Sequence, residues 1–64
     1  MNKGMELVIN SYLRLMSIPE KHRITENSFM FTDGVNNLVV MENPNHVSYN
    51  GSIVYSEGEY FETV

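Results

Sequence analysis

The N-terminal part of the chain places apolar residues at the period of an α-helix. Spacings of three and four residues put six side chains on one stripe: Met5, Val8, Ile9, Tyr12, Leu13 and Met16. Pro19 lacks a backbone N–H and disfavours helical geometry at Ile18, so the helix is predicted to span about residues 3–17. Leu7 and Leu15 flank the stripe and widen it. The stripe is interpreted as a core-facing surface, with an exposed apolar edge for a partner as the alternative.

The rest of the chain contains short β-prone runs separated by turn residues. Asp33-Gly34 and Asn50-Gly51 tolerate the positive φ of a two-residue hairpin turn, and Pro44 favours a reverse turn over residues 42–45. Residues 19–27 are polar and are predicted to be a connection between helix and sheet. The remaining runs predict strands at about residues 28–32, 35–42, 46–49, 52–56 and 59–63.

Side chains alternate along a strand, so the first hairpin has two apolar faces. A two-residue turn at Asp33-Gly34 pairs Thr32 with Val35. One face then carries Phe29, Phe31, Leu38 and Val40, and the other carries Met30, Val35, Val39 and Met41.

The second hairpin, turning at Asn50-Gly51, is predicted to pair Tyr49 with Ser52, Ser48 with Ile53 and Val47 with Val54. A one-residue bulge at Gly51 is the alternative, and it would exchange the faces of one strand.

These elements predict a single small α+β domain, in which one N-terminal helix packs on an antiparallel meander of four to five strands. A chain of 64 residues without cysteine has no disulfide to stabilise it. One helix covers one face of a sheet, which leaves the second apolar face exposed. We therefore expect a homodimer or obligate docking on another protein, with self-association through Met30, Val35, Val39 and Met41.

The net charge of −4 is unevenly distributed along the sequence. All four basic residues lie in the first 23 positions, namely Lys3, Arg14, Lys21 and Arg23. Two acidic residues in the same segment reduce its net charge to +2. From Ile24 onward six acidic residues and no Lys or Arg give −6. Such a field repels nucleic-acid phosphates and attracts basic protein surfaces.

The sequence contains no arrangement typical of a catalytic or cofactor site. Ser48 or Ser52 with His46 or His22 lacks the context of an activated nucleophile. His46 near scattered carboxylates does not make a specific metal-ligand set, and the four glycines are isolated, so there is no phosphate-binding loop. We expect no enzyme activity, no metal, no cofactor and no small-molecule substrate.

Membrane and nucleic-acid functions are also not expected. No run of apolar residues approaches the length of a membrane span, and Leu7-Val8-Ile9 is too short for a signal peptide, which favours a cytoplasmic protein. Lys21-His22-Arg23 is the only basic cluster and is far smaller than a nucleic-acid footprint.

The function predicted from these patterns is protein binding. Acidic and aromatic residues are combined near the C-terminus, a mixture that suits binding to a basic protein: Glu57, Glu59, Tyr60, Phe61 and Glu62. One hypothesis is an inhibitor encoded by a phage or mobile element, which occludes a basic nucleic-acid-binding host protein. The alternatives are a self-associating structural or regulatory subunit and a small RNA-binding module using the basic N-terminal end. Tyr60 and Phe61 have a competing interpretation as residues that close the core.

Overall fold

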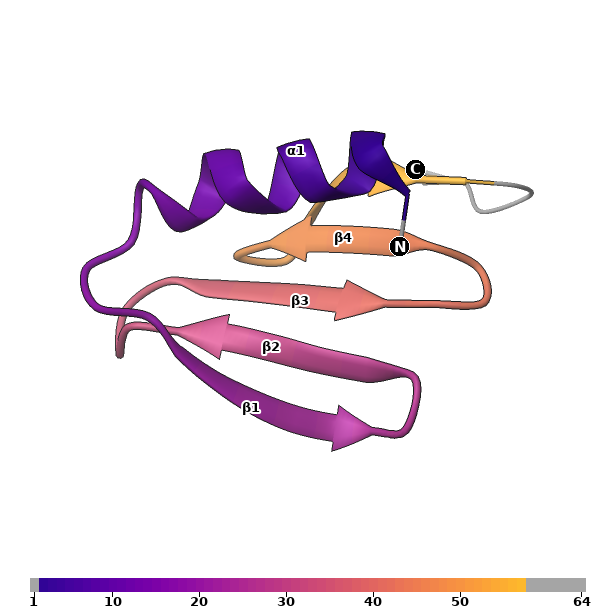
Figure 1. The fold of residues 1–64 in the computed structure, drawn as a ribbon. Coiled ribbons are helices and arrows are strands. Elements are labelled where there is room, and N and C mark those ends of the chain that lie inside the picture. Colours follow the sequence, from indigo (N-terminus) through magenta and orange to yellow (C-terminus); the bar gives the residue numbers. More distant parts are fainter. Residues whose placement is uncertain (1, 58–64) are drawn as a thin grey trace.

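The computed structural model describes residues 2–57 as one helix and one sheet. The elements are α1 (Lys3–Leu13), β1 (Glu20–Thr25), β2 (Ser28–Thr32), β3 (Asn37–Met41), β4 (His46–Tyr49) and β5 (Ser52–Ser56). The five strands form an antiparallel meander in chain order, and α1 packs on β3, β4 and β5 (Figure 1). The predicted α+β architecture is confirmed. The strand expected at 59–63 lies outside the described residues.

Helix α1 begins at a side-chain cap and ends earlier than the sequence predicts. Asn2 precedes the helix, and its Oδ1 accepts a hydrogen bond from the Met5 amide at 2.7 Å. The predicted end near residue 17 is wrong, because the last turn tightens: the Leu15 amide bonds to the Tyr12 carbonyl and the Met16 amide to the Leu13 carbonyl. The tightened turn directs Met16 into the core, where 8% of the residue is exposed.

Strand β1 occupies most of the segment predicted to be a connection, so that prediction is wrong. All six of its residues are exposed, which explains why no apolar alternation marks the strand in the sequence. Its backbone pairs with β2, and the tight turn between them is fixed by Thr25, whose Oγ1 accepts from the Asn27 amide at 3.1 Å. Edge strands are often short and charged, as this one is.

The loop between β2 and β3 spans residues 33–36 and is two residues longer than predicted. Thr32 therefore pairs with Asn37 instead of Val35, and β3 begins at Asn37. Asp33 stabilises the longer loop, because its carboxylate accepts from the amides of Val35 at 2.9 Å and Asn36 at 2.7 Å. A shift of two residues preserves the direction of every side chain, so the two predicted faces of the strands are otherwise unchanged.

The β4–β5 hairpin follows the prediction near its turn and departs from it farther along. Asn50 and Gly51 adopt φ values of 51° and 86°, and Tyr49 pairs with Ser52 as expected. Val47 pairs with Tyr55 instead of Val54, because an extra residue in β5 produces a bulge there rather than at Gly51. The bulge lets Val54 and Tyr55 both pack against the core.

We call the side of the sheet against which α1 packs the helix face. It holds the fully buried side chains of β3 and β4, namely Leu38, Val40 and Val47, which contact a core completed by Met5, Ile9 and Met16. The rings of Tyr12 and Tyr49 join helix to sheet, with centroids 4.6 Å apart. Within residues 2–57, no helix has the length and apolar character needed to cross a bilayer.

Candidate functional site

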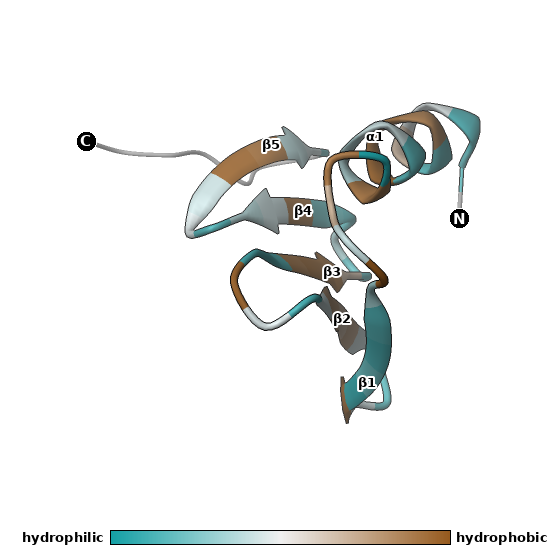
Figure 2. Ribbon diagram, turned by 90° about the vertical axis from the view of Figure 1, so that its left-hand side faces the viewer, coloured by the Kyte–Doolittle hydropathy of each residue, from teal (hydrophilic) through white to brown (hydrophobic). Residues whose placement is uncertain are grey.

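The side of the sheet opposite α1 is covered by no helix in the described part of the chain (Figure 2). We call it the open face and define it by the half-buried apolar side chains of Met30, Val39, Met41 and Ile53. The register places His22, Met30, Val39, Ser48 and Ile53 directly opposite one another across all five strands. The open face is therefore one continuous row of mainly apolar residues, not a set of isolated positions.

Across β2 to β5, the strand positions on the open face contain no Asp, Glu, Lys or Arg. Charge enters only at the β1 border, where His22 Nε2 lies 3.5 Å from Glu20 Oε1. Contact between two open faces would therefore bring no two like charges of β2 to β5 together.

Three of the four residues predicted to mediate self-association lie together on the open face: Met30, Val39 and Met41. Val35 does not, because the longer loop removes it from the strand and leaves it 81% exposed. The Asp33 carboxylate accepts from the amides of both Val35 and Ser17, which brings the loop near the end of the helix segment. Val35 therefore lies near Ile18, which follows Ser17 and is 89% exposed. The sequence prediction failed for Val35 because it assumed a two-residue turn.

A groove of about 300 Å³ lies on the helix face between α1 and the β1–β2 hairpin. It exists because α1 packs on β3, β4 and β5, so that Phe29 and Phe31 of β2 are only half-buried. The groove is lined by Glu6, Ile9, Asn10, Leu13, Lys21, Phe29 and Phe31. The sequence prediction placed the two phenylalanines on one face with Leu38 and Val40, but it missed the groove because it did not anticipate β1.

The groove combines an aromatic floor with a cationic rim. The rings of Phe29 and Phe31 meet edge to face, with centroids 5.7 Å apart. Lys21 Nζ lies 4.4 Å from the Phe29 ring centroid, a distance typical of a cation–π contact. Arg23 projects from the same side of β1, since it pairs with Phe29 while Lys21 pairs with Phe31.

A polar cluster joins the start of α1 to the end of β5. The Glu57 carboxylate accepts hydrogen bonds from the Tyr55 hydroxyl and from the Asn2 side-chain amide, and also from Asn45 Nδ2 at 3.2 Å. The Tyr55 hydroxyl and, after it, the Asn2 amide hold the pKa of Glu57 below its ordinary value. The same bond to Glu57 raises the pKa of Tyr55.

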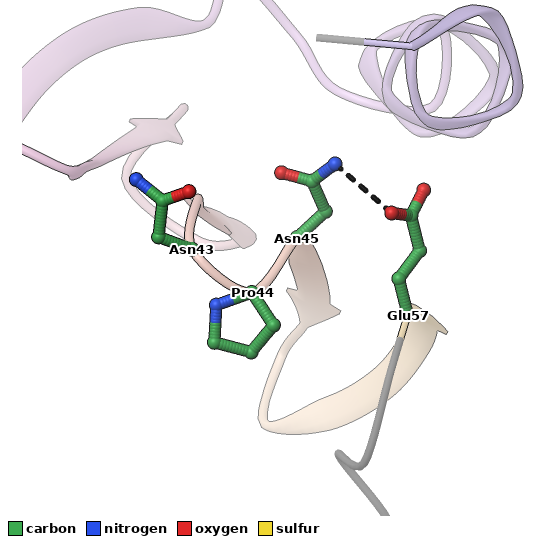
Figure 3. Close-up of a pocket in the computed structure, with 4 residues that line it drawn as sticks. All are labelled: Asn43, Pro44, Asn45 and Glu57. Atoms are coloured by element: carbon green, nitrogen blue, oxygen red, sulfur yellow. Dashed lines mark hydrogen bonds between the residues drawn. The ribbon is translucent and has the colours of Figure 1, made fainter.

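Beside this cluster is a hollow of about 230 Å³, lined by Asn43, Pro44, Asn45 and Glu57 (Figure 3). Asn45 and Glu57 point toward each other, whereas Asn43 and Pro44 form the turn on the other side. Because three donors already occupy the Glu57 carboxylate, we assign the cluster a structural role.

Glu57 is the one predicted partner-binding residue that the structure describes. Its carboxylate bonds within the chain, which leaves less of it for a partner. The other four predicted partner-binding residues lie outside the described residues: Glu59, Tyr60, Phe61 and Glu62.

The topology separates some of the residues considered for catalysis and leaves one pair near each other. His22 lies on β1 and Ser52 on β5, at opposite edges of the sheet, whereas His46 and Ser48 lie two residues apart on β4, where His46 is 7% exposed. Across residues 2–57, no three His, Asp or Glu side chains converge to form a metal-binding group. The described residues thus offer surfaces for binding rather than a cluster of reactive groups.

Comparison with protein-family models, with curated proteins and with solved structures found no match to this chain.

Proposed function

We propose that this protein is a non-enzymatic interaction module that forms a homodimer through the open face. The observation that carries the proposal is the row Met30, Val39, Ser48 and Ile53, which is apolar at three of its four positions, crosses β2 to β5 and is only half-buried. Contact with a second copy would remove these side chains from water, with a gain of about 25 cal/mol for each Å² of apolar surface buried.

The size of the open face sets the expected affinity. Five strands spaced by about 4.8 Å, each about five residues long, cover on the order of 300–400 Å² per copy. Two such faces give roughly 700 Å², below the 1,200 Å² or so at the lower end of stable interfaces. We therefore expect a reversible dimer that forms at micromolar or higher concentration.

Binding to a basic protein remains a second proposal, supported by charge. The four basic residues belong to α1, the turn that follows it and β1, whereas Glu42 and Glu57 lie after β3 and β5. In this proposal a cytoplasmic protein presents acidic residues in place of nucleic-acid phosphates, as an inhibitor from a phage or mobile element would. Capture of a basic protein that is lost as salt rises would support it.

Sedimentation velocity over a range from below one to several hundred micromolar tests the dimer. The proposal requires the weight-average mass to rise from one copy toward two as concentration increases, and the thermal midpoint to rise with it. A mass that stays at one copy at the highest concentration would refute self-association, and the basic-partner proposal would then be preferred.

A further inference from the structure

We propose that the groove between α1 and the β1–β2 hairpin binds residues 59–62 of a second copy of this chain. The inference goes beyond the proposed dimer, because the contact lies on the helix face and does not require the open face. It rests on the chemistry of the groove, on the chemistry of the segment and on the distance between them.

The groove suits an aromatic segment with negative charges. Phe29 and Phe31 provide ring surfaces that α1 leaves half-buried, and Leu13 closes the groove from the helix side. Lys21 lines its β1 edge, and Arg23 lies two residues farther along the same side of β1, opposite Phe29. Arg23 Nη1 donates to the carbonyls of Thr25 and Glu26 at 3.2 and 3.3 Å. These bonds use backbone carbonyls, and within residues 2–57 no carboxylate pairs with the guanidinium. Among the described residues, Glu6 is the one acidic residue that lines the groove.

Residues 59–62 have the complementary composition. They read Glu-Tyr-Phe-Glu, and no other part of the sequence places two adjacent aromatic residues between two carboxylates. Two aromatic side chains would add to the Phe29–Phe31 surface, while the flanking carboxylates would lie near Lys21 and Arg23. Both the apolar and the charged parts of the groove are thereby matched.

The distance indicates that the segment comes from a second copy. Strands β5 and β2 are separated by three strand spacings, about 14 Å, and α1 lies on the helix face along the direct route. Phe61 follows Glu57 by four residues, which span at most about 14 Å when fully extended. A path around α1 to β2 is longer than this reach, so the segment cannot contact Phe29 and Phe31 of its own chain.

Photo-cross-linking of the full chain tests the contact. Phe61 is replaced by p-benzoylphenylalanine, and protein of natural isotope content is mixed with ¹⁵N-labelled protein before irradiation and peptide mapping. The expected adducts join position 61 of a chain with one isotope label to Leu13, Lys21 or Phe31 of a chain with the other. Adducts confined to chains of one label, or adducts that map mainly outside the groove, would overturn the proposal.

A charge-exchange experiment provides the matched control. Lys21→Glu with Arg23→Glu is expected to reduce the yield of groove adducts about three- to tenfold, because two attractive pairs become repulsive. Mixing this variant with a chain carrying Glu59→Lys and Glu62→Lys is expected to restore the yield. His22→Glu, on the same strand but on the open face, is expected to leave it unchanged. An equal loss in the His22→Glu control, or no rescue by the exchanged charges, would contradict docking in the groove.

The two proposals fail in different ways. Val39→Asp is expected to disrupt the open-face dimer. The groove adducts are expected to persist in this variant, because the groove lies on the helix face. If the groove adducts are absent from a protein that sedimentation shows to be a dimer, the groove proposal is wrong and the proposed function stands.

Discussion

Leu38 and Val39 are neighbours in β3, yet the sheet places them in opposite environments. Leu38 is fully buried under α1, whereas Val39 is half-buried on the open face between Met30 and Ser48. Consecutive residues of a strand point to opposite sides of the sheet, and here only one side carries a helix. The same type of apolar residue therefore stabilises the single chain at one position and remains available for association at the next.

The Leu38 position predicts a large effect on stability. Leu38→Ala is expected to lower the free energy of unfolding by about 3 kcal/mol, since it removes a buried side chain and leaves a cavity. A domain of this size has roughly 3–10 kcal/mol in total, so urea should unfold the variant at a much lower concentration. A loss below about 1 kcal/mol would mean that Leu38 is not part of the core.

The Val39 position predicts an effect on association instead. Val39→Asp is expected to weaken association through the open face, so that the sedimenting mass rises only at higher concentration than for the unmodified chain, because the variant places a carboxylate in the apolar contact. Val35→Asp makes the same chemical change in the exposed loop and is expected to leave dimerisation intact. If both variants, or neither, lose the dimer, the open face is not the interface.

The turn at Asn50 allows a separate test of the β4–β5 hairpin. Asn50 has a φ of 51°, its Oδ1 accepts from the Asn37 amide at 2.8 Å, and its Nδ2 donates to Asn36 at 3.0 Å. Asn50→Ala is expected to lower the free energy of unfolding by about 1–2 kcal/mol, since it loses these bonds and strains the backbone. Asn50→Gly relieves the strain and should recover part of the loss in urea titrations. Equal stability of all three proteins would contradict this account.

Two carboxyl groups predict loss of stability in acid. Backbone amides of Asn36, Val35 and Ser17 lower the pKa of Asp33 from 3.8, and the Tyr55 hydroxyl lowers that of Glu57 from 4.5. The unfolded chain therefore binds protons at a higher pH than the folded chain. The stabilisation that the two carboxylates contribute should be fully present above about pH 5. It should decrease as the pH falls through 4.5 and 3.8 toward the lower pKa values of the folded chain.

The urea midpoint measured between pH 7 and pH 3 checks this expectation. Asp33→Asn should flatten the pH dependence of the urea midpoint, because it removes a carboxyl group whose pKa differs between the folded and the unfolded chain. Glu26→Gln makes the same change in the β1–β2 turn and serves as the control. A midpoint independent of pH in the unmodified chain would refute the role of both carboxylates.

Hydrophobic patterning predicted much of the fold for reasons visible at particular residues. The stripe from Met5 to Met16 forms the helix surface that contacts the sheet, although the helix itself ends at Leu13. The partners of Phe29 were predicted two residues out of register, but their faces were right because side-chain direction repeats every two residues. The bulge at Val54 was not predicted, and the alternative considered placed one at Gly51, since nothing in the local sequence distinguishes Val54 from a residue of a regular strand.

The candidate surfaces were predictable only in part. Met30, Val39 and Met41 follow from alternation, whereas the groove depends on β1 and on where α1 lies across the sheet. Strand β1 has six exposed residues and is held by backbone hydrogen bonds, which any sequence without proline can make. Its one retrospective sequence signal is the polar turn at Glu26-Asn27, flanked by the β-branched residues Ile24 and Thr25.

The sequence by itself determined which side chains share a surface, because the helical period and the strand alternation are local properties of the backbone. It also determined the reversal at Asn50-Gly51, where both residues accept positive φ. Only the tertiary structure decided that β1 joins the sheet, that α1 packs over β3, β4 and β5, and that Val35 lies in a loop. These outcomes depend on how the volumes of Met5, Leu38 and Val47 fit together and on which backbone groups find partners. Both are properties of the whole chain that no local pattern records.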